Sequence, residues 1–214
     1  MSGSPTLRER KAQLTRDEIL TAARRLFAEY GYAGTTVRDI AKEAGVSAQT
    51  VYDSIGSKQA LVARLNDLID SEANVAGLAA EAMRSTDPAF VAALSSRITT
   101  AILRHCTDIL RALTTGAASE PELSAAMEEG HRRHVTGARV VVTRLSELDA
   151  LGPPIDEAAD TLAAVSDVRL ALLLREAYGW SLEHIETWIA DTSRALLLAP
   201  AVPKPRRTSG PRSG

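Results

Sequence analysis

Side chains that can hydrogen-bond to the edges of DNA bases are grouped in one short polar stretch, residues 47–53. The Gln49 amide can pair with N6 and N7 of adenine, and the Thr50 methyl group can contact the methyl group of thymine. This stretch lies within residues 36–55, TVRDIAKEAGVSAQTVYDSI, whose spacing is that of a helix-turn-helix. Because the second helix of this motif enters the major groove, the spacing predicts that these side chains face DNA.

The local signals around this stretch specify both helices and the turn between them. The first helix is expected over residues 36–44, and Gly45 supplies the left-handed backbone position that ends it. Ser47 has the residue type of an N-cap for the second helix. Val46 and Val51 flank that cap at the spacing of a hydrophobic staple, which fixes the angle at which the chain enters the helix.

Residues that could instead support catalysis or metal binding are few. His131 and His134 are spaced to share a metal on one helix face, and His105 with Cys106 adds a nitrogen and a sulfur donor. The first pair, however, lies among charged residues typical of a solvated face, and the chain has no nucleophile elbow, Walker loop or dinucleotide fingerprint. We therefore expect no enzyme activity, no cofactor and no metal site.

Length and composition indicate a globular protein. The chain has 214 residues, of which 45% are hydrophobic, enough for a substantial core. The apolar runs are too short to span a bilayer and the first 14 residues lack a signal-peptide pattern, so we expect a cytoplasmic protein without membrane contact, associated with the nucleoid when bound to DNA. The single cysteine, Cys106, allows no intrachain disulfide.

Charge is distributed unevenly along the chain. The net charge is −2, but residues 1–64 carry +3, residues 65–199 carry −9 and the last fifteen residues carry +4. Polyanion binding needs local positive charge rather than a basic total, and an acidic remainder helps to confine the contact to one end.

Helical periodicity recurs along the chain and strand signals are nearly absent, which predicts an all-α fold. The first helix is expected to begin at Thr15, which forms a capping box with Glu18, and to end at Gly31. A fourth helix is expected from Ser57 to about residue 82. Later helices are expected over 88–115 with a possible kink, 120–150 opened by a Ser119 capping box, 156–178 and 181–198.

These elements divide the chain into four parts. Residues 1–14 are expected to form a flexible basic leader, with a minor-groove arm as the alternative. Residues 15–62 form the three-helix head that carries the helix-turn-helix over 36–55. Residues 63–199 form a helical ligand-binding and dimerisation domain, and residues 200–214, rich in Pro, Arg, Ser and Gly, form a disordered tail.

Over residues 15–65 the chain resembles the TetR family of bacterial one-component transcriptional regulators. The resemblance is carried by ILTAARRLFAEYGYAGTTVRDIAKEAGVSAQTVYDSIGSKQALVARL, which combines a helix, a Gly-aromatic turn, a helix-turn-helix and a Ser-Lys that opens the next helix. The C-terminal GWSLEHIETWIADTSRALLL is similar to a tract of actinobacterial members. The resemblance implies a DNA-binding head and a variable helical ligand domain.

The resemblance also implies roles for residues of the head. Thr36, Tyr52 and Lys58 occupy phosphate-contacting positions. Sequence specificity is assigned to the residues exposed at the start of the second helix, namely Ser47, Ala48, Gln49, Thr50 and Asp53.

Asp53 and Ile55 depart from the family pattern. Relatives often have an aromatic or basic residue at the position of Asp53, and phenylalanine at the position of Ile55. A carboxylate near phosphates weakens DNA binding unless it accepts from a cytosine amine or pairs with Lys58. Ile55 still supplies an apolar side chain, so only DNA affinity is placed in doubt.

For the body, the resemblance implies a homodimer with a small-molecule site. The expected interface lies on the last two helices, at Leu162, Val165, Leu172, Leu173, Trp188, Ile189 and Leu196, with the protomer's own core as the alternative. The candidate pocket residues are Arg104, His105, Cys106, His134, Arg169, Tyr178 and Trp180, with surface or core positions as the alternative.

The resulting functional prediction is a sequence-specific regulator of transcription. A repressor bound to a palindromic operator of double-stranded DNA, and released when an unidentified small-molecule effector binds, is the expected form; activation is also possible. The alternative is a helical ligand-sensing or scaffolding dimer with weak or lost DNA binding, for which Asp53 is the hint.

Overall fold

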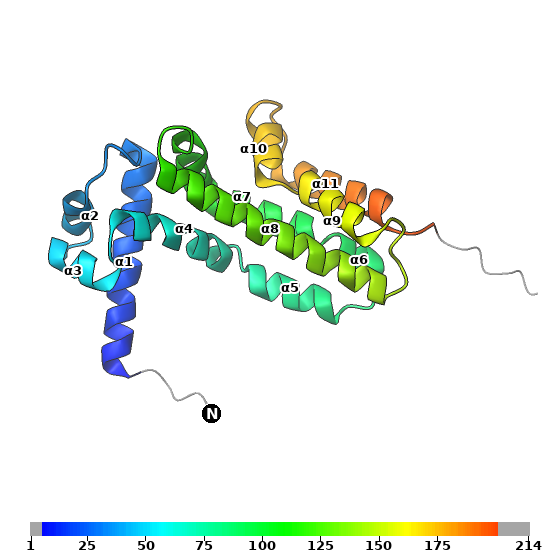
Figure 1. The fold of residues 1–214 in the computed structure, drawn as a ribbon, viewed down its shortest axis with the longest axis horizontal. Helices are drawn as coiled ribbons and strands as arrows, with labels where there is room; N and C mark the ends of the chain where they lie inside the picture. Colours follow the sequence, from blue (N-terminus) through cyan, green and yellow to red (C-terminus); the bar gives the residue numbers. More distant parts are fainter. Residues whose placement is uncertain (1–5, 201–214) are drawn as a thin grey trace, which may run out of the picture.

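The structure, a computed structural model, describes residues 6–200 and is all-helical, as predicted (Figure 1). Over these residues the only strand-like pairing is an isolated bridge between Leu151 and Leu198. Three helices form a head at one end, and the remaining helices form an elongated body. The predicted segments 1–5 and 201–214 lie outside the described residues.

The first helix of the head, α1, spans Leu7–Tyr30 and is longer than predicted. It begins eight residues before Thr15 because Thr6 caps it: the Thr6 hydroxyl accepts from the Glu9 N–H at 3.3 Å, and the Glu9 carboxylate accepts from the Thr6 N–H at 2.7 Å. Residues 7–14, expected to be a flexible leader, are therefore helical. They are also exposed, so this part of α1 projects beyond the core.

The helix-turn-helix is confirmed, with α2 over Val37–Glu43 and α3 over Ala48–Ser54. Thr36 caps α2 and forms a capping box with Asp39. Gly45 has φ = 68°, the left-handed conformation that the turn requires. Ser47 caps α3 by accepting from the Thr50 N–H at 3.0 Å, and Val51 is fully buried beneath it. These signals act within a few residues, which is why the sequence predicts this segment accurately.

The helix that leaves the head is shorter than predicted. It was expected to reach about residue 82, but α4 spans Lys58–Glu72 and a second helix, α5, spans Val75–Arg84. The break is at Asn74, whose left-handed backbone (φ = 51°) cannot continue a helix. Ser57 caps α4 as predicted, accepting from the Ala60 N–H at 3.2 Å.

The centre of the body consists of two long helices. The predicted segment 88–115 is divided into α6, Pro88–Ala92, and α7, Leu94–Gly116, and α7 is kinked at Cys106 (φ = −130°). The next helix, α8, spans Pro121–Glu147, but the capping box predicted at Ser119 is absent. Glu120 is the residue before the first turn, and the Ser119 hydroxyl donates to the Gly116 carbonyl at 3.3 Å instead.

The two helices predicted at the end of the chain are three helices in the structure. The segment 156–178 is broken into α9, Ile155–Val165, and α10, Val168–Glu176, because Asp167 caps α10 by accepting from the Arg169 N–H at 2.8 Å. The final helix, α11, spans Leu182–Leu197 and is capped by Ser181 as predicted.

Two clusters of buried side chains hold these helices together. The first joins the head to the near half of the body, since Ile19 of α1, Leu65 of α4, Leu103 of α7 and Ile185 of α11 belong to one continuous core. The second occupies the far half, between α6, α8, α9 and the end of α11, with Leu145 at its centre. The head therefore shares its core with the body.

Candidate DNA-binding interface and enclosed cavity

The surface that the sequence assigned to DNA lies at the end of the molecule away from the far half of the body, on α2 and α3 (Figure 1). Thr36, Ser47, Gln49 and Asp53 are exposed, and Tyr52 has 51% of its surface exposed. Ala48 and Thr50 are half-buried. Polar side chains on both helices and at their caps are thus open to solvent over the described part of the chain.

Asp53 is paired within its own helix rather than with Lys58. The Gln49 Nε2 donates to Asp53 Oδ1 at 2.8 Å, one helical turn away. This bond uses one of the two amide hydrogens and leaves the Gln49 carbonyl and the other hydrogen free to pair with a base. Asp53 therefore orients the side chain that is best suited to reading adenine.

Lys58 lies against Tyr32, a residue for which the sequence suggested no role. The Lys58 Nζ donates to the Tyr32 carbonyl and sits 3.7 Å from the centre of the Tyr32 ring, which packs in turn on Phe27. Burial lowers the pKa of Lys58, and the carboxylates of Glu120 and Glu122 oppose that shift. The Gly-aromatic pair at residues 31–32 was the available signal for this contact.

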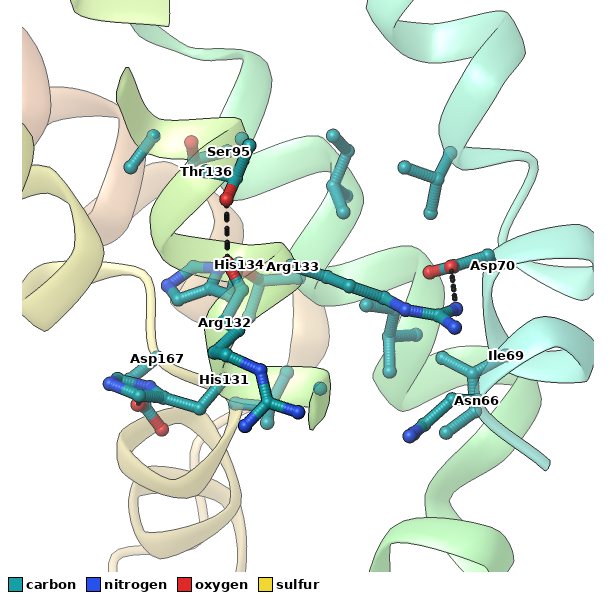
Figure 2. A pocket seen from close by; sticks show the side chains of 18 of the residues that line it. Asn66, Ile69, Asp70, Ser95, His131, Arg132, Arg133, His134, Thr136 and Asp167 are labelled. Carbon is teal, nitrogen blue, oxygen red and sulfur yellow. Dashed lines mark hydrogen bonds and ion pairs between the residues drawn. The ribbon is translucent and has the colours of Figure 1, made fainter. Parts of the chain in front are cut away.

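The body contains a partly open cavity of about 570 Å³ between α4, α5, α7 and α8, lined at one end by the start of α10 (Figure 2). This volume lies within the usual range for small-molecule sites. Most of the wall is apolar, with Ile69 on α4, Met83 on α5, Ile98 on α7 and Met127 on α8. Since α4 begins at Lys58, the cavity and the candidate DNA-binding surface share a helix.

Charged side chains at the cavity are paired with one another. Figure 2 shows Arg133 extending from α8 toward Asp70 of α4, where the two ions are 2.8 Å apart. Arg133 also bonds to Asp67 at 3.0 Å and to Glu129 at 2.9 Å. The hydrogen bonds to Glu129, Asp70 and Asp67 raise the pKa of Arg133 and outweigh the desolvation of the guanidinium, which lowers it. The wall of the cavity is thus tied by ion pairs to the helix that leaves the head.

Of the residues predicted to line a pocket, the structure places two at this cavity, His134 and Arg169. His134 Nε2 lies 2.9 Å from the Ala163 carbonyl, and Arg169 pairs with Asp167. Arg104, His105 and Tyr178 are exposed elsewhere. Cys106 is buried near Glu72, and burial together with that carboxylate raises the pKa of its thiol to about 12. Trp180 stacks on His184, also away from the cavity.

The predicted dimer residues fall into two groups. Leu162, Leu172 and Ile189 are buried in the protomer's own core, so they cannot present a side chain to a second chain. Val165 and Trp188 are half-buried against the first core. Leu173 and Leu196 each have 50% of their surface exposed and stay candidates for an interface. Periodicity alone could not separate these groups, because inner and outer faces of the last helices are both apolar.

A partly buried junction that was not predicted from the sequence links the head to the body. The Arg24 guanidinium of α1 bonds to Asp108 of α7 at 2.7 Å, to Glu72 of α4 at 2.6 Å and to the His105 carbonyl at 2.5 Å. Burial alone would raise the pKa of Asp108, but the hydrogen bonds and charge of Arg24 hold it below its ordinary value. One side chain therefore fixes three helices at the kink of α7.

Two further findings bear on the class of protein. Over residues 6–200 no cluster of three or more His, Cys, Asp or Glu side chains is arranged to hold a metal ion. Within the same residues no helix combines the length and the apolar composition needed to cross a bilayer.

The molecule has a three-helix head, in which the second helix of the helix-turn-helix is exposed, and a helical body with a cavity. This is the architecture of a helix-turn-helix protein with a separate ligand-binding-like body. The sequence model for bacterial regulatory proteins of the tetR family matches residues 19–65. In fold, the chain is similar to a TetR-family transcriptional regulator from Mesorhizobium loti, with a TM-score of 0.67 over 86% of this chain and 96% of that one at 21% identity.

Curated relatives match in the N-terminal part. The HTH-type transcriptional repressor KstR2 of Mycobacterium tuberculosis is 39% identical over 71 residues, 28% of this chain and 36% of that protein. The HTH-type transcriptional regulator TtgR of Pseudomonas putida is 37% identical over 78 residues, 36% of this chain and 37% of that protein. The matches thus span little more than a third of these relatives. Over residues 19–65 the chain matches the model of the TetR family of bacterial regulatory proteins, and its fold is similar to that of a TetR-family regulator.

Proposed function

We propose that this protein is a sequence-specific DNA-binding regulator of transcription that acts as a homodimer and responds to a small molecule. The observation that carries the proposal is the exposed, separately capped α3, with Gln49 oriented by Asp53 at 2.8 Å. Names of relatives that are repressors or regulators support it.

DNA contact divides into positioning and reading. Thr36 is at the N-terminus of α2, where a helix favours an anion such as phosphate, and Tyr52 can add a hydroxyl. Lys58, whose Nζ is held on Tyr32, lies in the first turn of α4. Gln49 then reads a base with its free amide edge, while Ser47, Ala48, Thr50 and Asp53 complete the surface that meets the groove.

A regulatory step follows from the position of α4. Its first turn is fixed to the head by Lys58, and its later turns supply Asn66, Ile69 and Asp70 to the cavity wall. A molecule that fits the cavity only after α4 shifts would therefore favour one orientation of the head. In a two-fold dimer the α3 helices must sit about 34–36 Å apart to enter successive major grooves, so such a shift would release a palindromic operator. Repression relieved by an effector is the form of regulation that we propose.

The proposal is tested by selecting fragments of genomic DNA with the full chain and measuring affinity at several salt concentrations. We expect specific retention with affinity that falls steeply with salt, because phosphate contacts release counterions. Gln49→Ala should cost about 1–3 kcal/mol at one base pair of each half-site and leave the other positions unchanged.

Thr86→Ala, at an exposed site between α5 and α6, is the matched control and should bind like the parent chain. A flat salt response without sequence preference would contradict the proposal and favour a scaffolding dimer in which Asp53 repels DNA. Loss of binding to all sequences alike in Gln49→Ala would contradict the role of Gln49 as a base reader.

A further inference from the structure

The cavity contains two polar side chains that are buried and incompletely bonded. Ser95 of α7 is 7% exposed, and its hydroxyl has no hydrogen-bond partner within residues 6–200. Asn66 of α4 is 6% exposed; its Nδ2 donates to the Ala126 carbonyl at 2.8 Å, but its Oδ1 has no partner among the described groups. Neither atom is among the fully buried unsatisfied polar atoms of the described residues, so both are accessible from the cavity and can bond to a ligand or to water.

Gly130 of α8 keeps the Asn66 oxygen accessible. A Cβ placed on Gly130 would lie 3.4 Å from Asn66 Oδ1, in ordinary van der Waals contact, so a side chain at this position would cover one side of that atom. Figure 2 shows Asn66 and Ser95 on opposite sides of the Arg133 side chain in this view. The two polar atoms are thus supplied by different helices of the same wall.

Each arginine of the cavity wall is paired with a carboxylate of the same wall. Arg132 pairs with Glu129 at 2.6 Å, Arg133 with Asp70 at 2.8 Å, and Arg169 with Asp167 at 2.7 Å. An anionic ligand could recruit an arginine only by breaking a pair, and a cationic ligand could recruit a carboxylate only in the same way. Either ion would also lose its hydration in a mostly apolar cavity.

We propose that the cavity binds an uncharged, mainly apolar molecule that carries a hydroxyl group. The apolar body of the molecule fills the space between α4, α5, α7 and α8. The hydroxyl supplies the donor that Asn66 Oδ1 needs, or bonds to the Ser95 hydroxyl, which can donate or accept. This inference rests on the proposed function, since it names the class of effector that the regulator recognises.

The experiment measures binding of four probes to the full chain without DNA by calorimetry at pH 7. The probes share one ring system and are 2-naphthol, naphthalene, 2-naphthoate and 2-naphthylmethylammonium. We expect 2-naphthol to bind about 2- to 10-fold more tightly than naphthalene, the net value of one neutral hydrogen bond. Each ion should bind more than about tenfold more weakly than 2-naphthol.

Variants then assign the hydroxyl contact. Ser95→Ala should reduce the preference for 2-naphthol over naphthalene if the hydroxyl bonds to Ser95, and Gly130→Ala should reduce it if the hydroxyl bonds to Asn66 Oδ1. Binding of naphthalene should be kept in Ser95→Ala. Ser96→Ala is the matched control, because the Ser96 hydroxyl is buried on the Ala93 carbonyl and does not line the cavity. Gly130→Ala should still fold, since alanine has a higher helix propensity than glycine.

The inference is overturned if a charged probe binds most tightly, if no probe binds, or if neither variant changes the preference for the hydroxyl. Because DNA is absent, failure of specific DNA retention contradicts the proposed function without affecting these titrations. Conversely, DNA retention with no binding of 2-naphthol would leave the regulator in place and remove this class of effector.

Discussion

The head and the body are both helical and use the same capping chemistry, but their functional residues are assembled differently. In the head the side chains proposed to contact DNA fall between Thr36 and Lys58, and their positions are set by caps and turns within a few residues of each other. The cavity of the body draws on residues from Asn66 to Arg169, on five helices. A site on one exposed helix is specified locally, whereas a cavity depends on how distant helices pack.

The largest effect is expected in the core that the head and the body share. Leu65 of α4 is 1% exposed and belongs to the cluster that joins head and body. Leu65→Ala should lower the free energy of unfolding by about 2–5 kcal/mol through lost burial and a cavity. Hydrogen exchange should speed up together in α2 and α11, because both pack on this core.

Leu145→Ala is the control, since Leu145 is equally buried but lies in the second cluster. It should cost a similar free energy and leave the exchange of α2 less affected at low denaturant. If Leu65→Ala accelerates exchange in α2 alone, the head is an independent folding unit and the shared core is energetically divided.

The junction at Arg24 is expected to have a smaller effect. Asp108 has a depressed pKa in the folded state, so its contribution to stability is complete above its unfolded pKa of about 3.9 and is lost as the pH falls through the folded value. Arg24→Gln removes the charge that causes this depression. We expect a loss of about 1–2 kcal/mol at pH 7, discounted because the partner carboxylates are about a third exposed.

Denaturation at several pH values between about 2 and 7 checks this prediction. The difference in stability between the parent chain and Arg24→Gln should narrow below about pH 4, as Asp108 becomes protonated in the parent chain. Arg16→Gln is a control, because Arg16 bonds only to Gln13 on its own helix. A difference that stays constant down to pH 2 would show that Arg24 acts through packing rather than charge.

The smallest effect is expected at the first cap of the head. Thr6→Ala removes the capping box of α1, a change that commonly costs about 1 kcal/mol in a packed helix. Here residues 7–14 pack on no core, so the first turns should unwind without lowering the melting temperature. Circular dichroism should show a small loss of helix, whereas Ser47→Ala, at the cap of α3, should lower DNA binding. A drop of several degrees in the melting temperature of Thr6→Ala would contradict this view.

The features that could be predicted from the sequence are those that depend on residues close together in the chain. The all-α fold, the turn at Gly45 and the caps at Ser47, Ser57 and Ser181 were predictable because each depends on neighbours in the chain. The breaks at Asn74 and Asp167 were missed, although both residue types favour such positions, because the apolar periodicity continues through them.

For the sites, the residues of α3 proposed to contact DNA followed from the motif, and Gln49, Tyr52 and Asp53 are exposed in the structure. The residues of the cavity could not be predicted in the same way. His134 and Arg169 were anticipated. The other polar residues became recognisable only once α4, α7 and α8 were packed together, namely Asn66, Ser95 and Arg133. Leu162 and Ile189 show the same limit, since an apolar residue on a helix does not reveal which neighbour covers it.

The burial of Cys106 has a practical consequence for measuring the two heads of a dimer. It is the single cysteine of the chain, it is fully buried, and its pKa of about 12 leaves about one thiolate in ten thousand at pH 8. A cysteine introduced at an exposed position of the head, such as Lys42, would therefore be the only one to react with a maleimide or a spin label. The distance between labels in a dimer could then be followed by resonance energy transfer or pulsed paramagnetic resonance as DNA or 2-naphthol is added, without first removing a native thiol.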